Sequence, residues 1–162
     1  MHYFAYGSNL HSQRLLERTP SAQPVTVARL SGYQLRFHKR SNLDGSGKCD
    51  AWRTDRAKDF VLGFVWDLPP EEKTILDRIE DVGFGYRVEG VEVEASQGPL
   101  NAFTYCAEAS HIEPGLRPFH WYKNYVVQGA REHGLDPAYI EQIEQVVADR
   151  DPDRERAKRN RF

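Results

Sequence analysis

The chain has 162 residues, of which 40% are hydrophobic and 12% aromatic, which is enough for one domain with a continuous core. Its 22 basic and 24 acidic residues give a formal charge of -2, so charge alone gives no reason to expect a nucleic-acid partner. Cys49 and Cys106 are too few for a disulfide framework, and no segment resembles a secretion signal or a membrane span. We therefore expect a cytoplasmic protein with a small-molecule partner, and neither nucleic acid nor membrane as a partner.

The first predicted strand, residues 2–6, runs into Gly7, Ser8 and Asn9, which favour a turn. A short helical pattern follows, with Ser8 or Asn9 as its expected N-cap and Pro20 as its end. A loop between a strand and a helix start can present backbone N–H groups to a carboxylate or an oxyanion. An ordinary strand-to-helix turn explains the same residues, so the loop alone leaves both interpretations open.

Two strands are predicted over residues 24–30 and 33–39, because apolar side chains recur at every second position, and Ser31-Gly32 would join them as a hairpin. The basic stretch His38-Lys39-Arg40 resembles a small phosphate site, but we interpret it as a solvated hairpin tip. A polar loop is expected over 42–48, and strands over 49–53 and 60–68.

A helix is predicted to begin at Pro69-Pro70, with Ile75, Leu76 and Ile79 on one apolar face, and to end near Glu80. Two further strands, residues 86–95 and 100–107, are expected to pair across a short turn. The apolar parity of the first of these strands slips at Gly90, which predicts a bulge there.

The remaining predicted elements are helices over residues 118–133 and 137–147. Residues 149–162 form a charged tail that we expect to fray or to lie on the surface. Residues 1–148 then form a single domain. Because strands dominate the first 107 residues without regular alternation with helices, we predict an α+β fold with a curved, barrel-like mixed sheet and flanking helices.

The segment Tyr6-Gly7-Ser8-Asn9-Leu10, directly after the first strand, closely resembles the signature loop of the γ-glutamylcyclotransferase (AIG2-like) family. Three further segments, residues 27–30, 76–82 and 122–135, are similar to the family in the same order, so the resemblance covers about residues 3–140. It implies the family's fold and its reaction, in which a γ-glutamyl amide cyclises to 5-oxoproline and releases an amine or an amino acid.

The resemblance also implies roles for individual residues. By position, Glu80 corresponds to the family's catalytic acid/base, although Asp81 stands where the family often has glycine. From the local sequence alone, Glu80 also fits a solvated helix end, and Tyr122 also fits a core position on an amphipathic helix. The substrate-binding residues implied by the resemblance are Tyr3, Phe4, Ala5, Tyr6, Gly7, Ser8, Asn9 and Tyr122.

The implied role of Glu80 is chemically reasonable. The substrate's own amine, normally an ammonium, must lose a proton before it attacks the γ-carbonyl carbon, and the departing amine must gain one, so one carboxyl group can serve both steps. A helix C-terminus and burial beside Phe84 and Tyr86 would disfavour the anionic form of Glu80. Since the substrate supplies the nucleophile, no catalytic cysteine, metal or organic cofactor is expected, and the six histidines lack metal-site spacing.

Two alternative functions remain compatible with the sequence. One is a non-catalytic module that binds a small carboxylate at the Gly-Ser loop. The other is a specialised cyclotransferase that removes a γ-glutamyl group from a larger biosynthetic amine, for which a roomy, acidic pocket would be the sign. The sequence identifies neither the leaving amine nor the oligomeric state.

Overall fold

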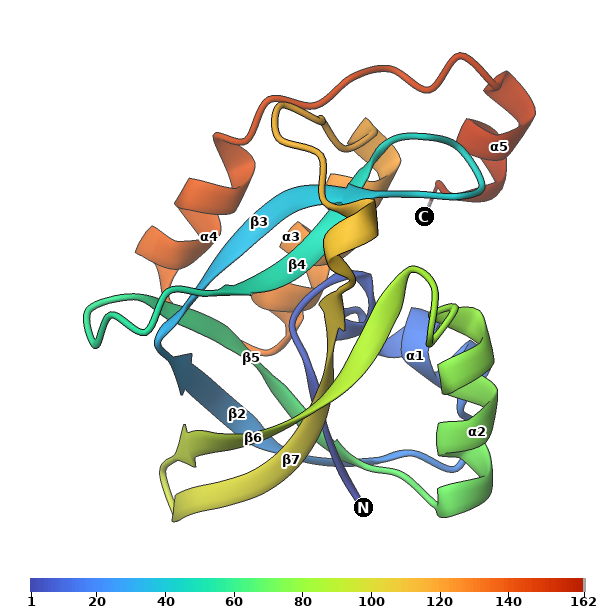
Figure 1. Ribbon diagram of the computed structural model, residues 1–162. Coiled ribbons are helices and arrows are strands. Elements are labelled where there is room, and N and C mark those ends of the chain that lie inside the picture. The colour runs from blue at the N-terminus through green and yellow to red at the C-terminus, as the bar shows by residue number, and fades with distance from the viewer. Residues whose placement is uncertain (162) are drawn as a thin grey trace.

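The N-terminal strand β1, His2–Ala5, belongs to a five-stranded closed barrel in the computed structural model, which describes residues 1–161. The strand order is β1-β5-β2-β6-β7, and β1 pairs antiparallel with β5 and parallel with β7. The barrel fills the lower half of the molecule in Figure 1. The predicted α+β fold with a barrel-like mixed sheet is therefore confirmed. The other barrel strands are β2 (Gln23–Ser31), β5 (Phe60–Asp67), β6 (Tyr86–Ala95) and β7 (Gly98–Ala107).

The hairpin predicted at Ser31-Gly32 is wrong. The chain turns at Gly32, which has a φ of 83°, but β2 pairs with β5 and β6 rather than with β3, Tyr33–Arg40. Strand β3 instead pairs with β4, Gly47–Arg53, in a separate two-stranded sheet that lies above the barrel in Figure 1. Alternating apolar residues identify a strand but not its partner, so adjacency in sequence was a poor guide to pairing.

The bulge predicted at Gly90 is also wrong. Strands β6 and β7 pair in an unbroken register, in which Gly90 lies opposite Phe103. The apolar parity changes because the two halves of β6 pack against different clusters: Tyr86 joins one, and Val91 and Val93 join the other. An irregularity of this kind does occur in β2, where the register shifts between Pro24 and Thr26.

The helices flank the barrel and the small sheet. Helix α1, Ser12–Arg18, is capped by His11, whose Nδ1 accepts the Arg14 N–H at 3.4 Å. The predicted cap at Ser8 or Asn9 is wrong because these residues form their own turn, the 3-10 helix η1, Ser8–Leu10. The remaining helices are α2 (Pro70–Ile79), η2 (Ala109–His111), α3 (His120–Glu132), α4 (Pro137–Glu144) and α5 (Arg154–Arg159).

The two faces of β1 feed two hydrophobic clusters, since successive side chains of a strand point to opposite sides. Phe4 belongs to the larger cluster, which joins barrel strands to α3 and α4, and Ala5 belongs to the second, which reaches α1 and α2. Both side chains are fully buried. Burial of a phenylalanine contributes about 2–3 kcal/mol, so this strand, which also carries the predicted substrate loop, is firmly held.

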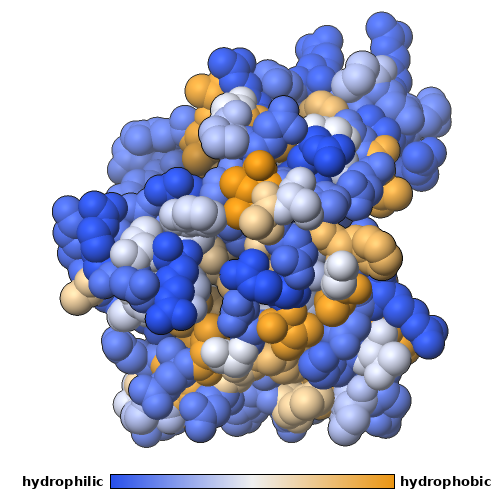
Figure 2. All heavy atoms as spheres, in the orientation of Figure 1, coloured by the Kyte–Doolittle hydropathy of each residue, from blue (hydrophilic) through white to orange (hydrophobic). Residues whose placement is uncertain are grey.

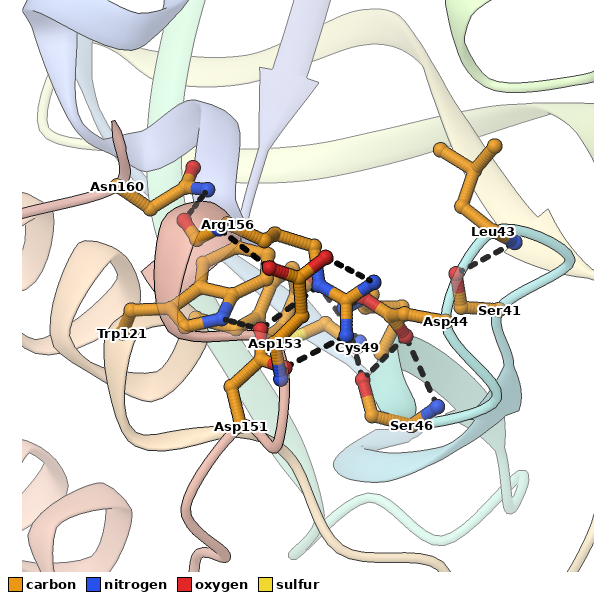
Figure 3. A network of polar contacts seen from close by, with 12 residues as sticks. Ser41, Leu43, Asp44, Ser46, Cys49, Trp121, Asp151, Asp153, Arg156 and Asn160 are labelled. Carbon is orange, nitrogen blue, oxygen red and sulfur yellow. Dashed lines mark hydrogen bonds and ion pairs between the residues drawn. The ribbon is translucent and has the colours of Figure 1, made fainter. Parts of the chain in front are cut away.

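The segment after residue 148 does not fray. Its Asp151 side chain is fully buried and accepts hydrogen bonds from Trp121 Nε1 at 2.8 Å and from two nitrogens of Arg156 at 2.6 and 2.7 Å. Figure 3 shows these groups close to Asp44 and Ser46 of the 41–46 loop. Of the two outcomes expected for this segment, fraying is wrong, whereas its mostly exposed residues do lie on the surface. Charge composition did not reveal the buried ion pair that anchors α5.

The outer surface is mainly polar. On the face shown in Figure 2, hydrophilic side chains dominate and the apolar ones form small, separate groups. Among residues 1–161, no helix has both the length and the apolar character that a membrane crossing requires.

Candidate active site

The loop that follows β1 is held in a tight turn against α3. The Leu10 N–H donates to the Gly7 carbonyl at 3.0 Å, and the His11 N–H donates to the Ser8 carbonyl at 3.3 Å. A Cβ atom at Gly129 of α3 would lie 2.5 Å from the Leu10 backbone, so only glycine permits this approach. The loop after β1 and helix α3, which both belong to segments that resemble the family, are therefore in direct contact. Their backbone packing sets the position of the loop.

Glu80 lies at the end of α2, where its backbone N–H donates to the Leu76 carbonyl at 2.9 Å. The next residue, Asp81, has a φ of 53°, in the left-handed region that glycine adopts most readily. This accounts for the glycine that the family often has at this position. The turn directs the Glu80 side chain, which is 18% exposed, toward the loop after β1.

Asn9 connects the loop to Glu80. Its Nδ2 donates to Glu80 Oε1 and to the Tyr3 hydroxyl, both at 3.0 Å, and its Oδ1 accepts from Arg18 Nη1 at 2.7 Å. Donors and acceptor all have partners, which fixes the orientation of the amide. Because Asn9 is only 4% exposed, this bridge holds the carboxyl group at a defined distance from the loop.

The electrostatic surroundings of Glu80 differ from those expected. Arg18 Nη1 lies 3.3 Å from Glu80 Oε1, so a cation that the sequence analysis did not anticipate pairs with this carboxyl group. Phe84 is 68% exposed and does not cover the site, so the expected burial beside it is wrong. Tyr86, at 7% exposure, is the aromatic residue that lines the cavity beside Glu80.

Two tyrosines bind the backbone of Cys49 in β4. The Tyr122 hydroxyl accepts the Cys49 N–H at 3.0 Å, and the Tyr86 hydroxyl donates to the Cys49 carbonyl at 2.7 Å. Burial raises the pKa of Tyr122, Tyr86 and Tyr3 above the usual range, so all three phenols are neutral at physiological pH. Burial also raises the pKa of the Cys49 thiol to about 12, which leaves it a poor nucleophile.

A small cavity of about 30 Å³ lies where these elements meet. The structure brings seven of the predicted site residues to its wall and leaves two apart, because the side chains of Phe4 and Ala5 are buried in the hydrophobic clusters. The predicted site residues on the wall are Tyr3, Tyr6, Gly7, Ser8, Asn9, Glu80 and Tyr122, and they are joined by Cys49, Tyr86 and Tyr105.

A larger cleft of about 390 Å³ adjoins the small cavity and shares Ser8, Glu80, Tyr86 and Tyr122 with it. Sequence reasoning missed the cations of this cleft. The stretch interpreted as a solvated hairpin tip is largely buried, since Lys39 is 6% exposed and His38 forms a 2.7 Å pair with Asp50. A usable signal existed in α1, where two arginines four residues apart share one face. The basic side chains of the cleft are Arg14, Arg18, Lys39, Lys48 and Arg78, and the acidic ones are Glu80 and Asp81.

Comparisons with known proteins show which family the chain is similar to. Residues 60–143 match the model of the AIG2-like family. The chain is 33% identical over 152 residues to a protein of Homo sapiens named gamma-glutamylcyclotransferase, and 32% identical over 152 residues to its namesake in Mus musculus; each alignment covers 89% of this chain and 77% of the relative. A solved structure named gamma-glutamyl cyclotransferase superposes with a TM-score of 0.82 at 30% identity, covering 91% of this chain and 88% of the other.

Proposed function

The chain belongs to the gamma-glutamylcyclotransferase family, and from this premise we propose that it is an enzyme that cleaves γ-glutamyl amides by cyclisation to 5-oxoproline. One observation carries the proposal at the level of the site. The Glu80 carboxyl group lies 3.0 Å from the amide nitrogen of Asn9, on the wall of a cavity that the predicted substrate loop also lines.

Glu80 is the acid/base of the proposed reaction. Its carboxylate takes a proton from the substrate's α-ammonium, and the amine nitrogen then attacks the γ-carbonyl carbon to form the ring C–N bond. The original amide C–N bond breaks as the proton held by Glu80 passes to the departing nitrogen. The regenerated carboxylate then takes the second proton that the ring nitrogen must lose and returns it to the released amine, which leaves as an ammonium. Atoms and charge balance without a covalent enzyme intermediate, so the chain contributes mainly positioning and proton transfer.

The remaining wall residues are proposed to bind the γ-glutamyl half. The backbone N–H groups at the start of η1, at Ser8 and Asn9, would bind the α-carboxylate of the substrate. Neutral tyrosines such as Tyr122 would provide a wall that adds no competing negative charge beside the developing oxyanion. Arg18 and Asn9 hold Glu80 in position between these groups.

A specialised cyclotransferase that releases a larger biosynthetic amine is less well supported. Its expected sign is an acidic pocket, because the leaving group would be cationic. The cleft beside Glu80 has five basic and two acidic side chains on its wall, which is the opposite polarity. Two buried free cysteines, Cys49 and Cys106, support a reducing, cytoplasmic location for the proposed enzyme, within the metabolism of glutathione-related γ-glutamyl compounds.

The test separates an enzyme from a binding module. Purified protein is incubated with γ-glutamyl amino acids and γ-glutamylamines, and 5-oxoproline is measured by mass spectrometry. We expect 5-oxoproline and free amine in equal amounts from at least one class. If calorimetry detects binding of the same compounds while none of them yields 5-oxoproline, the protein is a carboxylate-binding module and the enzymatic proposal is wrong.

A further inference from the structure

The cleft beside Glu80 contains more positive charge than its acidic side chains balance. Two of its five cations have partners, since Arg18 pairs with Glu80 at 3.3 Å and Lys48 pairs with Asp44 at 3.0 Å. Of the acids on the wall, only Asp81 then remains to balance the other three cations. About two positive charges are therefore in excess.

Of these three cations, Lys39 is buried, Arg14 is partly buried and Arg78 is exposed. Within the described residues, no carboxylate lies at ion-pair distance from the Lys39 or Arg14 side chain. The Lys39 ammonium lies 4.6 Å from the centre of the Tyr86 ring, and the carboxylates of Glu80 and Asp81 attract it only from farther away. The Arg14 guanidinium lies 4.3 Å from the centre of the Tyr125 ring, and its buried Nε has no hydrogen-bond partner.

These cations also lie near one another. Burial lowers the pKa of Lys48, and the charges of Arg14 and Lys39 add to that lowering while Asp44 opposes it. Holding three cations around one cleft costs free energy in the empty protein. An anion bound in the cleft would reduce the repulsion among these cations and stabilise the protein. Binding sites often carry such a cost in stability when they are empty.

We propose that the leaving half of the substrate is an acidic amino acid, whose two carboxylates are bound by Lys39 and Arg14. This inference rests on the proposed cyclotransferase function and specifies its substrate class. The γ-glutamyl half carries one ammonium and one carboxylate and is neutral overall. A leaving amino acid with a neutral side chain adds one negative charge, whereas aspartate or glutamate adds two, which matches the charge in excess.

Isosteric substrate pairs test the proposal, because they differ by one charge. We expect kcat/KM for γ-glutamylaspartate to exceed that for γ-glutamylasparagine by about tenfold, the effect of one partly screened ion pair, and likewise for the glutamate and glutamine pair. Lys39→Met and Arg14→Met should each reduce this ratio toward one, with Lys39→Gln as a replacement if the Met variant does not fold. Arg40→Met is the matched control, since Arg40 is exposed and absent from the cleft, and it should keep the ratio.

The outcomes separate this inference from the proposed function. Equal kcat/KM values within each pair, or a preference that survives in both cleft variants, would overturn the inference while cyclotransferase activity stands. If no γ-glutamyl compound is turned over, the proposed function fails. Calorimetry with free aspartate and free asparagine then tests whether the cleft binds an acidic amino acid. Aspartate binding that Lys39→Met abolishes would then support the anion site, and equal binding of the two amino acids would refute it.

Discussion

The cavity and the cleft that meet at Glu80 differ in how their polar groups are partnered. In the cavity, the Asn9 amide uses both its donor and its acceptor atoms, and Tyr122 and Tyr86 bind the backbone of β4. In the cleft, Lys39 is buried and Arg14 is partly buried, and neither has an ion-pair partner among the described residues. The first region is organised before any ligand arrives, whereas the second has charge that a ligand would neutralise.

Glu80→Gln should give the largest effect and tests the organised region. Glutamine can keep a hydrogen bond to Asn9 but cannot accept and return a proton, so kcat should fall by about 10²–10⁴. The melting temperature and circular dichroism should stay close to those of the wild type. Glu71→Gln, an exposed position in the first turn of the same helix, is the control and should retain full turnover. An active Glu80→Gln enzyme would disprove the acid/base role.

Asn9→Ala should give the next largest effect, because it removes the bridge between the loop and Glu80. Loss of a hydrogen bond to a charged group should reduce kcat/KM by about 10- to 100-fold. We expect most of this reduction to come from a lower kcat, with little change in KM. Steady-state kinetics would measure this effect, with Asn101→Ala as the control because Asn101 is an exposed asparagine in β7. A pure KM effect would mean that Asn9 binds substrate without positioning the acid.

Asp151→Asn removes a charge that has an ion-pair partner, unlike Lys39 and Arg14 of the cleft. Hydrogen bonds from Arg156 lower the pKa of Asp151 to about 2, from 3.8 for an unperturbed aspartate. The stabilisation is therefore present above about pH 4 and is lost as the pH falls toward 2. We expect the variant to lose about 1–3 kcal/mol of unfolding free energy at pH 7, and less at pH 3.

Denaturant titrations across this pH range measure that difference. Asp149→Asn is the control, because its 3.5 Å pair with Arg117 is exposed and should contribute little at any pH. A destabilisation by Asp151→Asn that is the same at pH 3 and pH 7 would show that the ion pair does not anchor the tail.

Lys39→Met should give the smallest change, and in the opposite direction. Burial lowers the pKa of Lys39, so the folded protein is penalised wherever the unfolded lysine is protonated. Removing the charge should stabilise the protein by about 1 kcal/mol at pH 7, and this gain should vanish as the pH rises past about 10.5. Thermal melts of Lys39→Met, with Arg40→Met as the control, would measure this gain in stability. A lower melting temperature for Lys39→Met would indicate that the Lys39 charge already has a partner.

The sequence predicted elements better than their arrangement. Strand and helix positions followed from local periodicity and turn residues, and the loop and Glu80 followed from the resemblance to a family. The pairing of β2 with β5, and the cleft formed by Arg14, Lys39 and Lys48, depend on contacts between distant segments that no local pattern reports. Lys39 is the clearest case, because a charged residue in a basic stretch is normally solvated and tertiary packing alone buried it.

A crystal structure of Glu80→Gln with an intact γ-glutamyl dipeptide tests the central claim most directly, since the substitution should trap the substrate before cyclisation. The account predicts that the substrate's α-amine nitrogen lies within about 3.2 Å of the side-chain oxygen of residue 80, with its carboxylate at the turn of Ser8 and Asn9. An amine that points away from residue 80, or a dipeptide bound outside this cavity, would contradict the account.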